Sequence, residues 1–335
     1  MPDLPTQFTK AKSNVEPIND DKDNAAAAHA EVRKVLEADP DLKEWGIDSV
    51  LIGSYKRRVS IRRVKDVDVL AKLPTLPTDM IPGDALAHVV KVLRAAFDTD
   101  DEKRVKRQDR SVMVKFPDFD LHVDVVPARP AGDYLEIPDK QDDGTIAWKT
   151  TNPEKLTTLS SELNADYDDE YVPVVKLVRQ ARRQHLGRKG KPGGLFFEIL
   201  SYHAFNDDEL DTSSTASLFT GVLRSVATQL RDVVNGGDVE DPTMDGTVMS
   251  VRASDEEFGD AADAFEDLAT MAGTALASDD RCAAAKEFRD ILGKNDDGDW
   301  VFEMPATCND DGTPKSVAVI SAGDRAVPAG DGRFA

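Results

Sequence analysis

Three acidic residues in two short apolar segments have the types and spacing that could support chemistry. Asp66 and Asp68 alternate with valines in residues 65–70, and Asp124 occurs in the alternating segment 121–126. Because alternate side chains of a strand share a face, Asp66 and Asp68 would point together, and pairing of the two strands would bring Asp124 beside them. Three adjacent carboxylates repel one another unless a cation neutralises them. The pattern therefore predicts a site for Mg²⁺ or Mn²⁺ that also takes substrate phosphates.

A Gly-Ser pair upstream of these carboxylates adds the features of a phosphate site. Gly53 and Ser54 directly follow the apolar segment 49–52. Glycine allows the backbone to approach a phosphate closely, and the serine hydroxyl and nearby amides can donate to its oxygens. Two metal ions about 3.5–4 Å apart could activate an attacking hydroxyl and stabilise a leaving pyrophosphate. Asp124 is the residue that we expect to accept the hydroxyl proton, and the substrate is expected to be a nucleoside triphosphate.

These motifs resemble those of a known family. Residues 53–61 resemble the Gly-Ser-Tyr-x-Arg-x-Thr-x-Ile stretch of polymerase-β-like nucleotidyltransferases. Asp66 and Asp68 match their Asp-x-Asp, and Asp124 matches their third carboxylate in its Val-Asp-Val-Val-Pro-Ala context. Over about residues 8–305 the chain is similar to the bacterial cGAS/DncV-like nucleotidyltransferases (CD-NTases) of CBASS antiphage systems.

The resemblance implies both a fold and an activity. The fold would be α/β (α+β), with a mixed sheet and helices followed by a helical lobe. The catalytic core with its N-terminal helix would cover residues 1–150, the lobe 151–305 and a flexible tail 306–335. The enzyme would join NTPs into a cyclic di- or trinucleotide second messenger for antiphage signalling, releasing pyrophosphate. That messenger would activate a separate effector protein.

Two basic residues on one expected helix complete the predicted nucleotide site. Lys176 and Arg179 lie one turn apart on the same helix face and would support the triphosphate. Arg179 stands where relatives commonly have Lys, and a guanidinium can also bind a triphosphate. Gly194 stands where many relatives have a Ser that contacts phosphate. His122, beside the third carboxylate, is interpreted as a structural histidine rather than a ligand.

Other readings and partners stay open at this point. The acceptor could instead be a tRNA end or a protein, or the chain could be an inactive nucleotide-binding scaffold. The acidic C-terminal half argues against tRNA, whose binding depends on phosphate contacts. The terminal residues resemble tails of CBASS synthases that a ubiquitin-transfer-like accessory protein joins to another molecule, here through Ala335. An ordinary chain end without such a role is the alternative.

Composition limits the class of protein. The 335 residues carry a net charge of −21, which argues against a stable complex with duplex nucleic acid. Lysines and arginines nevertheless cluster around residues 56–65, 103–110 and 179–191, where they would attract an anionic substrate. No segment predicts a signal peptide or a membrane span. We therefore expect a cytoplasmic protein whose two cysteines, Cys282 and Cys308, are reduced.

The hydrophobic pattern predicts the elements that must position the site. Strands are expected at residues 49–52, 66–71, 111–116 and 121–126, the last two as a hairpin. Helices are expected at residues 23–36, 84–97, 154–164, 171–184, 195–205, 216–234, 255–277 and 280–292. Ser254 and Glu257 predict a capping box at the start of the penultimate helix, and Gly293 predicts the end of the last one.

Overall fold

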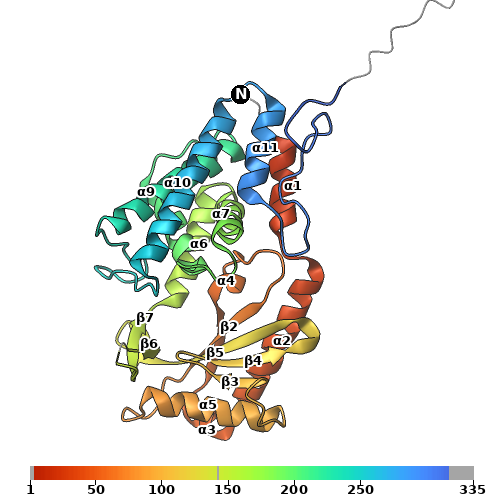
Figure 1. Ribbon diagram of the computed structural model, residues 1–335. Coiled ribbons are helices and arrows are strands. Elements are labelled where there is room, and N and C mark those ends of the chain that lie inside the picture. The colour runs from red at the N-terminus through yellow and green to blue at the C-terminus, as the bar shows by residue number, and fades with distance from the viewer. Residues whose placement is uncertain (1–3, 142, 317–335) are drawn as a thin grey trace, which may run out of the picture.

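Strand β2 (Asp66–Lys72) lies inside a mixed sheet and carries the first two carboxylates. In the computed structural model, which describes residues 4–141 and 143–316, the strand order is β1-β2-β5-β4-β3 (Figure 1). The partners are β1 (Asp48–Ile52), β5 (Leu121–Ala131), β4 (Val112–Phe116) and β3 (Val105–Arg107). β2 and β5 are parallel, whereas the other pairs in this order are antiparallel. The predicted mixed sheet is confirmed.

A twisted ribbon extends the sheet beyond the predicted strands. β5 continues past residue 126 and pairs with β6 (Tyr134–Lys140), which pairs with β7 (Ile146–Thr151). Neither β6 nor β7 was predicted, and the short edge strand β3 was also missed. β5 and β6 both contain proline, which lacks a backbone donor and weakens the sequence pattern of a strand.

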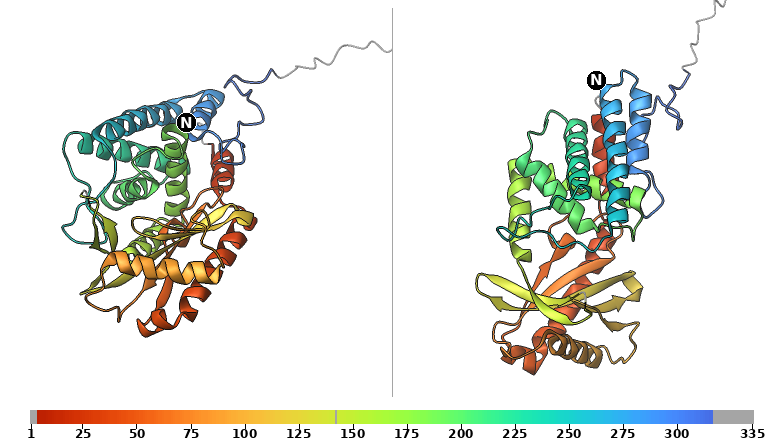
Figure 2. Two further views of the ribbon diagram at one scale, coloured as in Figure 1. Left: turned by 60° about the horizontal axis from the view of Figure 1, so that its bottom comes forward. Right: turned by 60° about the vertical axis from the view of Figure 1, so that its left-hand side comes forward.

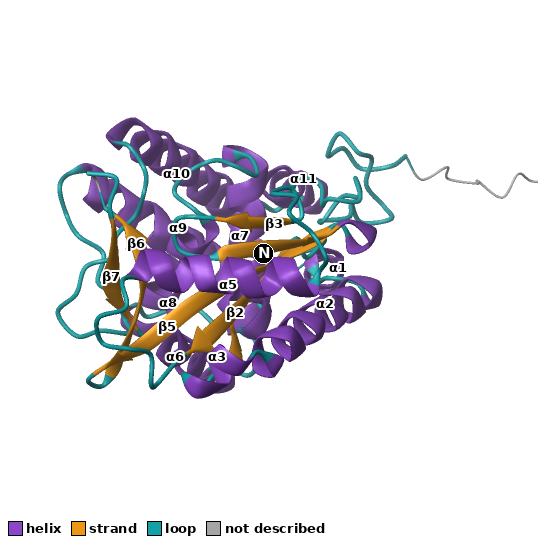
Figure 3. Ribbon diagram, turned by 90° about the horizontal axis from the view of Figure 1, so that it is seen from below, coloured by secondary structure: helices purple, strands orange, loops and turns teal. Residues whose placement is uncertain are grey.

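One face of the sheet is covered by helices. These are α2 (Asn19–Ala38), α3 (Pro40–Glu44) and α5 (Pro82–Ala96), the last lying across the strands in Figure 3. Val67 and Val69 of β2 are fully buried in one core cluster with Leu86 and Val89 of α5. Because strand side chains alternate, Asp66 and Asp68 face the other side, as predicted.

The second half of the chain forms a helical layer above that other side (Figures 1 and 2). Its helices are α6 (Pro153–Asp166), α7 (Tyr171–Leu186), α8 (Gly194–Asp207), α9 (Thr215–Val234), α10 (Asp255–Ala277) and α11 (Arg281–Leu292). The N-terminal helix α1 (Pro5–Val15) was not predicted and packs against this layer. The ring centroids of Phe8 and Phe288 are 4.9 Å apart. The proposed division at residues 150 and 305 remains a prediction.

Local signals set the ends of these helices. The capping box of Ser254 and Glu257 is present at the start of α10. Gly293 ends α11 with a positive φ of 58°. Asn152 caps α6 by accepting a hydrogen bond from the Lys155 amide at 3.3 Å. In the part of the chain that the structure describes, no helix is both long and apolar enough to cross a bilayer.

The prediction that the two cysteines are reduced is wrong. Cys282 of α11 and Cys308 form a disulfide, although 26 residues separate them in the sequence. The chain after α11 turns back along this helix, where Arg289 pairs with Asp310 at 2.7 Å and lies over the ring of Trp300. The return of the chain brings the two thiols together, and cysteine spacing alone does not reveal such a return. Residues 317–335, including the predicted site of conjugation at Ala335, lie outside the described residues.

Candidate active site

The Gly-Ser turn lies against the second carboxylate of β2. Gly53 directly follows β1 and is the first residue of the short helix α4 (Gly53–Lys56). Its φ is +75°. A Cβ at this position would lie 1.9 Å from Oδ2 of Asp68, so only glycine fits beside this carboxylate. The Ser54 hydroxyl lies 3.1 Å from that of Ser60. The close contact places a donor-rich turn at the edge of the acidic cluster.

Strand register brings the three predicted carboxylates together. In the parallel pair of β2 and β5, Asp68 is opposite Asp124 and Asp66 is opposite His122. The Ser111 hydroxyl donates to Oδ1 of Asp124 at 3.3 Å, and His122 Nε2 lies 3.5 Å from its Oδ2. The predicted pairing of the two strands is therefore confirmed, and it was the condition for a shared acidic face.

The cluster carries more negative charge than the surrounding protein balances. Burial, followed by the charges of Asp66 and Asp124, raises the pKa of Asp68 from 3.8 to about 7. The pKa of His122 is raised chiefly by its interaction with Asp124. A proton held by Asp68 partly offsets the repulsion. Oxygen ligands in this number and with this charge fit a hard divalent cation, which would take the place of that proton.

A cavity of about 410 Å³ connects these carboxylates with the helical half. Arg179 of α7, which was predicted to bind the nucleotide, lines this cavity. Asp124 does not line it, although it lies opposite Asp68 on the neighbouring strand. Lys176 is also outside the lining, because its buried ammonium forms an ion pair with Glu16, the residue that follows α1. The other lining residues are Ile52, Gly53, Ser54, Arg57, Asp66, Asp68, Thr151, Asn152, Pro153, Leu156, Gly194, Leu195, Glu198, Ile199, Asp241, Thr243 and Met249.

Two oppositely charged residues of this cavity, Arg57 and Glu198, form an ion pair that the sequence did not predict. Arg57 follows the Gly-Ser turn, and its guanidinium donates to both oxygens of Glu198 on α8, at 2.5 and 3.0 Å. Arg57 belongs to the Gly-Ser motif of residues 53–61, which was a signal for its importance. The motif did not reveal a partner 141 residues away.

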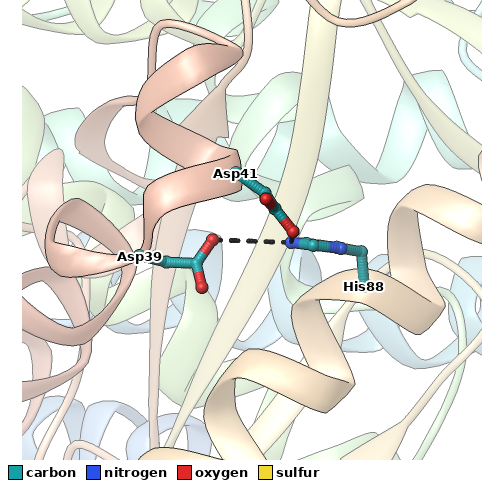
Figure 4. Close-up of side chains that lie close together, drawn as sticks. All are labelled: Asp39, Asp41 and His88. Atoms are coloured by element: carbon teal, nitrogen blue, oxygen red, sulfur yellow. Dashed lines mark ion pairs between the residues drawn. The ribbon is translucent and has the colours of Figure 1, made fainter.

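A second group of metal-type ligands lies elsewhere in the fold. Asp39 and Asp41, at the start of α3, approach Nε2 of His88 on α5 at 3.5 and 3.7 Å (Figure 4). α3 precedes β1, whereas Gly53 and Asp68 are at the other end of that strand, where Ile52 pairs with Asp68. This group is therefore separate from the carboxylates of β2 and β5.

Replacement of Gly53 by alanine is expected to lower activity by at least about tenfold. The new Cβ would overlap the Asp68 carboxylate. The alanine would also have to adopt a left-handed backbone conformation that L residues disfavour. Initial rates of pyrophosphate release from ATP with Mg²⁺ measure the effect. Gly132→Ala is the matched control, because Gly132 has a φ of +64° and open space around its Cβ position. Equal activity of the two variants would show that the contact with Asp68 is unimportant.

Comparison with known proteins identifies the class of enzyme. A model of the Second Messenger Oligonucleotide or Dinucleotide Synthetase domain matches residues 3–164. Cyclic AMP-AMP-AMP synthase of Acinetobacter sp. (strain ATCC 27244 / 9458) is 26% identical over 298 residues, which cover 86% of this chain and 83% of that protein.

Solved structures show the same fold. CdnC of E. coli MS115-1 with ATP is 16% identical, covers 90% of this chain and 99% of its own, and has a TM-score of 0.69. GTP-bound DncV of Vibrio cholerae is 12% identical, covers 87% of this chain and 95% of its own, and has a TM-score of 0.69. Residues 3–164 thus match the Second Messenger Oligonucleotide or Dinucleotide Synthetase domain, which identifies a nucleotidyltransferase that synthesises cyclic oligonucleotides, and the chain as a whole has the fold of CdnC and DncV.

Proposed function

We propose that Asp66, Asp68 and Asp124 hold two Mg²⁺ ions, for which Mn²⁺ can substitute. The observation that carries this proposal is the register of β2 and β5, which sets Asp68 opposite Asp124 on the face shared with Asp66. Bound ions would polarise the α-phosphate and stabilise the departing pyrophosphate. Asp124 accepts the proton of the attacking ribose hydroxyl, and the Ser111 hydroxyl keeps its carboxylate in place.

The triphosphate would lie between the Gly-Ser turn and α7. The Ser54 hydroxyl and the amides that begin α4 donate to its oxygens, while Arg179 contributes positive charge from the opposite side of the cavity. Lys176 has no part in this proposal, because Glu16 already holds its ammonium away from the cavity lining. The acidic protein thus concentrates positive charge where an anionic substrate would bind.

The substrates that we propose are adenine nucleotides. The curated relative is named a cyclic AMP-AMP-AMP synthase, and the chain matches most of its length. The product would be a cyclic oligoadenylate that activates a separate effector protein. The predicted action of an accessory protein on Ala335 remains a proposal as well, since that residue lies outside the described part of the chain.

The product can be identified directly. Purified protein is incubated with all four labelled NTPs and Mg²⁺, and the products are treated with phosphatase and resolved by chromatography and mass spectrometry. We expect a phosphatase-resistant product that contains only adenine. A resistant product with other bases would contradict the substrate assignment, and only linear or acceptor-linked products would contradict the proposed cyclisation.

A further inference from the structure

Three charged side chains meet beneath the cavity, at the junction of the sheet and the helical half. Arg57 comes from the end of α4, Glu198 from α8 and Arg179 from α7. Their side chains are 4%, 0% and 17% exposed. The Arg57 guanidinium holds both Glu198 oxygens, and Arg179 Nη1 donates to Oε2 of Glu198 at 3.3 Å. One buried carboxylate therefore binds two guanidiniums from different parts of the fold.

Stability alone does not explain this arrangement. Removing charges from water is costly, and buried ion pairs can often be replaced by apolar residues without loss of stability. Here two cations share one anion, which leaves a net charge of about +1 by formal count. Nε of Arg179 is buried without a hydrogen-bond partner among the described residues. Asp66 and Asp68 of the same cavity also act on the charge of Arg179, so the position of this cationic group beside the acidic cluster calls for an explanation beyond stability.

The excess charge faces the place where phosphates are expected. All three residues line the cavity that also contains Asp66 and Asp68. Arg57 is the C-cap residue of α4, the helix that Gly53 begins, and its amide donates to the Gly53 carbonyl at 3.2 Å. The position of the Gly-Ser turn is thus connected through Arg57 and Glu198 to the position of Arg179.

Gly194 provides the space that Arg179 occupies. The Arg179 Nη1 donates to the Gly194 carbonyl at 3.3 Å. A Cβ at position 194 would lie 3.2–3.4 Å from three guanidinium atoms, which is closer than ordinary van der Waals contact. Its φ is outside the positive range, so the backbone itself does not require glycine here. A larger residue at position 194 would therefore require the Arg179 guanidinium to shift by a few tenths of an ångström or more.

We propose that Glu198 is a positioning residue, which fixes Arg57 behind the Gly-Ser turn and Arg179 over Gly194, so that both bind one nucleoside triphosphate in a single geometry. The inference rests on the proposed function of the cavity. It adds that Arg179 and Gly194 are a matched pair: the guanidinium takes the volume that a side chain at 194 would fill. Glu198 itself does not touch the substrate.

A cycle of substitutions at positions 179 and 194 tests the matched pair. Gly194→Ser would displace the guanidinium, and Arg179→Lys would lose its bridge between Glu198 and the Gly194 carbonyl. Each change is expected to raise the KM for ATP about tenfold with a smaller effect on kcat, because a phosphate contact is made before and during the reaction. The double variant should return to within about threefold of the wild type, since a lysine leaves room for the serine hydroxyl.

The controls separate positioning from folding. Serine is well tolerated in the first turn of a helix, so Gly194→Ser should keep the wild-type unfolding temperature. Gly259→Ser, in open space on α10, should leave KM unchanged. Steady-state pyrophosphate release with ATP is measured for every variant. A wild-type KM for Gly194→Ser, or losses that simply multiply in the double variant, would overturn the matched pair.

Glu198→Gln tests the positioning role itself. If the variant folds, as shown by its unfolding temperature, we expect a rise in KM for ATP of at least about tenfold, because the guanidiniums lose their shared anion. A folded Glu198→Gln with the wild-type KM would overturn the role of Glu198. If this variant does not fold, Arg179→Lys decides: a wild-type KM in that variant, which loses the contact of the guanidinium with Glu198, would overturn the positioning role. Failure of the proposed function is recognised separately, because the wild type would then release no pyrophosphate from any NTP.

Discussion

Asp124→Asn is expected to lower the rate of nucleotide incorporation by about a thousandfold or more while the protein stays folded. The substitution keeps the shape of the side chain but removes a negative metal ligand and the proposed proton acceptor, and loss of a general base alone typically costs 10²–10⁴-fold. The Asn side chain can still accept the Ser111 hydrogen bond, so β5 should keep its register. Incorporation of labelled ATP measures the rate, and circular dichroism checks the fold.

Asp120→Asn is the matched control for this prediction. Asp120 lies just before β5, and its side chain is 87% exposed beside Lys65. Its φ of +51° is one that asparagine tolerates well. We expect activity within about twofold of the wild type, because exposed ion pairs contribute little. Substantial activity of Asp124→Asn, with the control unaffected, would show that Asp124 is neither a required ligand nor the base.

The sequence predicted the acidic face because that face depends on local periodicity. Alternation in residues 65–70 and 121–126 placed Asp66, Asp68 and Asp124 on shared faces, and only the pairing of two neighbouring strands was left to infer. Lys176 shows the limit of the same reasoning. Its spacing from Arg179 correctly suggests one helix face, but α7 is buried over most of its surface, and the two side chains reach different neighbours.

Contacts between distant segments could not be read from spacing. Glu198 meets Arg57 only because the helical half is placed over the end of β1, and Cys282 meets Cys308 only because the chain returns along α11. Neither pair leaves a pattern within a short window of sequence. The ribbon of β6 and β7 was missed for another reason: Pro138 and the polar residues of these strands interrupt the alternation that identifies strands.

In the absence of metal, Asp68→Asn is expected to be more stable than the wild type at pH 8. The pKa of Asp68 is about 7 in the folded protein and about 3.8 in the unfolded chain. The folded state therefore binds more protons between these values, and the free energy of unfolding falls as the pH rises from about 4 to 7. Asparagine cannot ionise, so the variant lacks this loss, which amounts to at most about 4 kcal/mol for a shift of this size.

Urea unfolding in EDTA between pH 4 and pH 8 measures this difference. The two proteins should be most similar near pH 4, and the advantage of the variant should grow until about pH 7 and then level off. Asp120→Asn should run parallel to the wild type over this range, because Lys65 lowers the pKa of Asp120 and its stabilising effect is lost only as the pH falls below about 4. Parallel curves for the wild type and Asp68→Asn would show that Asp68 is ionised throughout.

Addition of Mg²⁺ or Mn²⁺ at pH 8 should reduce the stability advantage of Asp68→Asn over the wild type. A ligand that binds only the folded state stabilises it by about 2.7 kcal/mol at one hundred times its Kd. The wild type should gain this stability because the cation replaces the missing proton among three carboxylates, whereas Asp68→Asn retains only two of them and should gain less. Equal stabilisation of both proteins would place the cation elsewhere, and the group of Asp39, Asp41 and His88 would then be the first alternative to test.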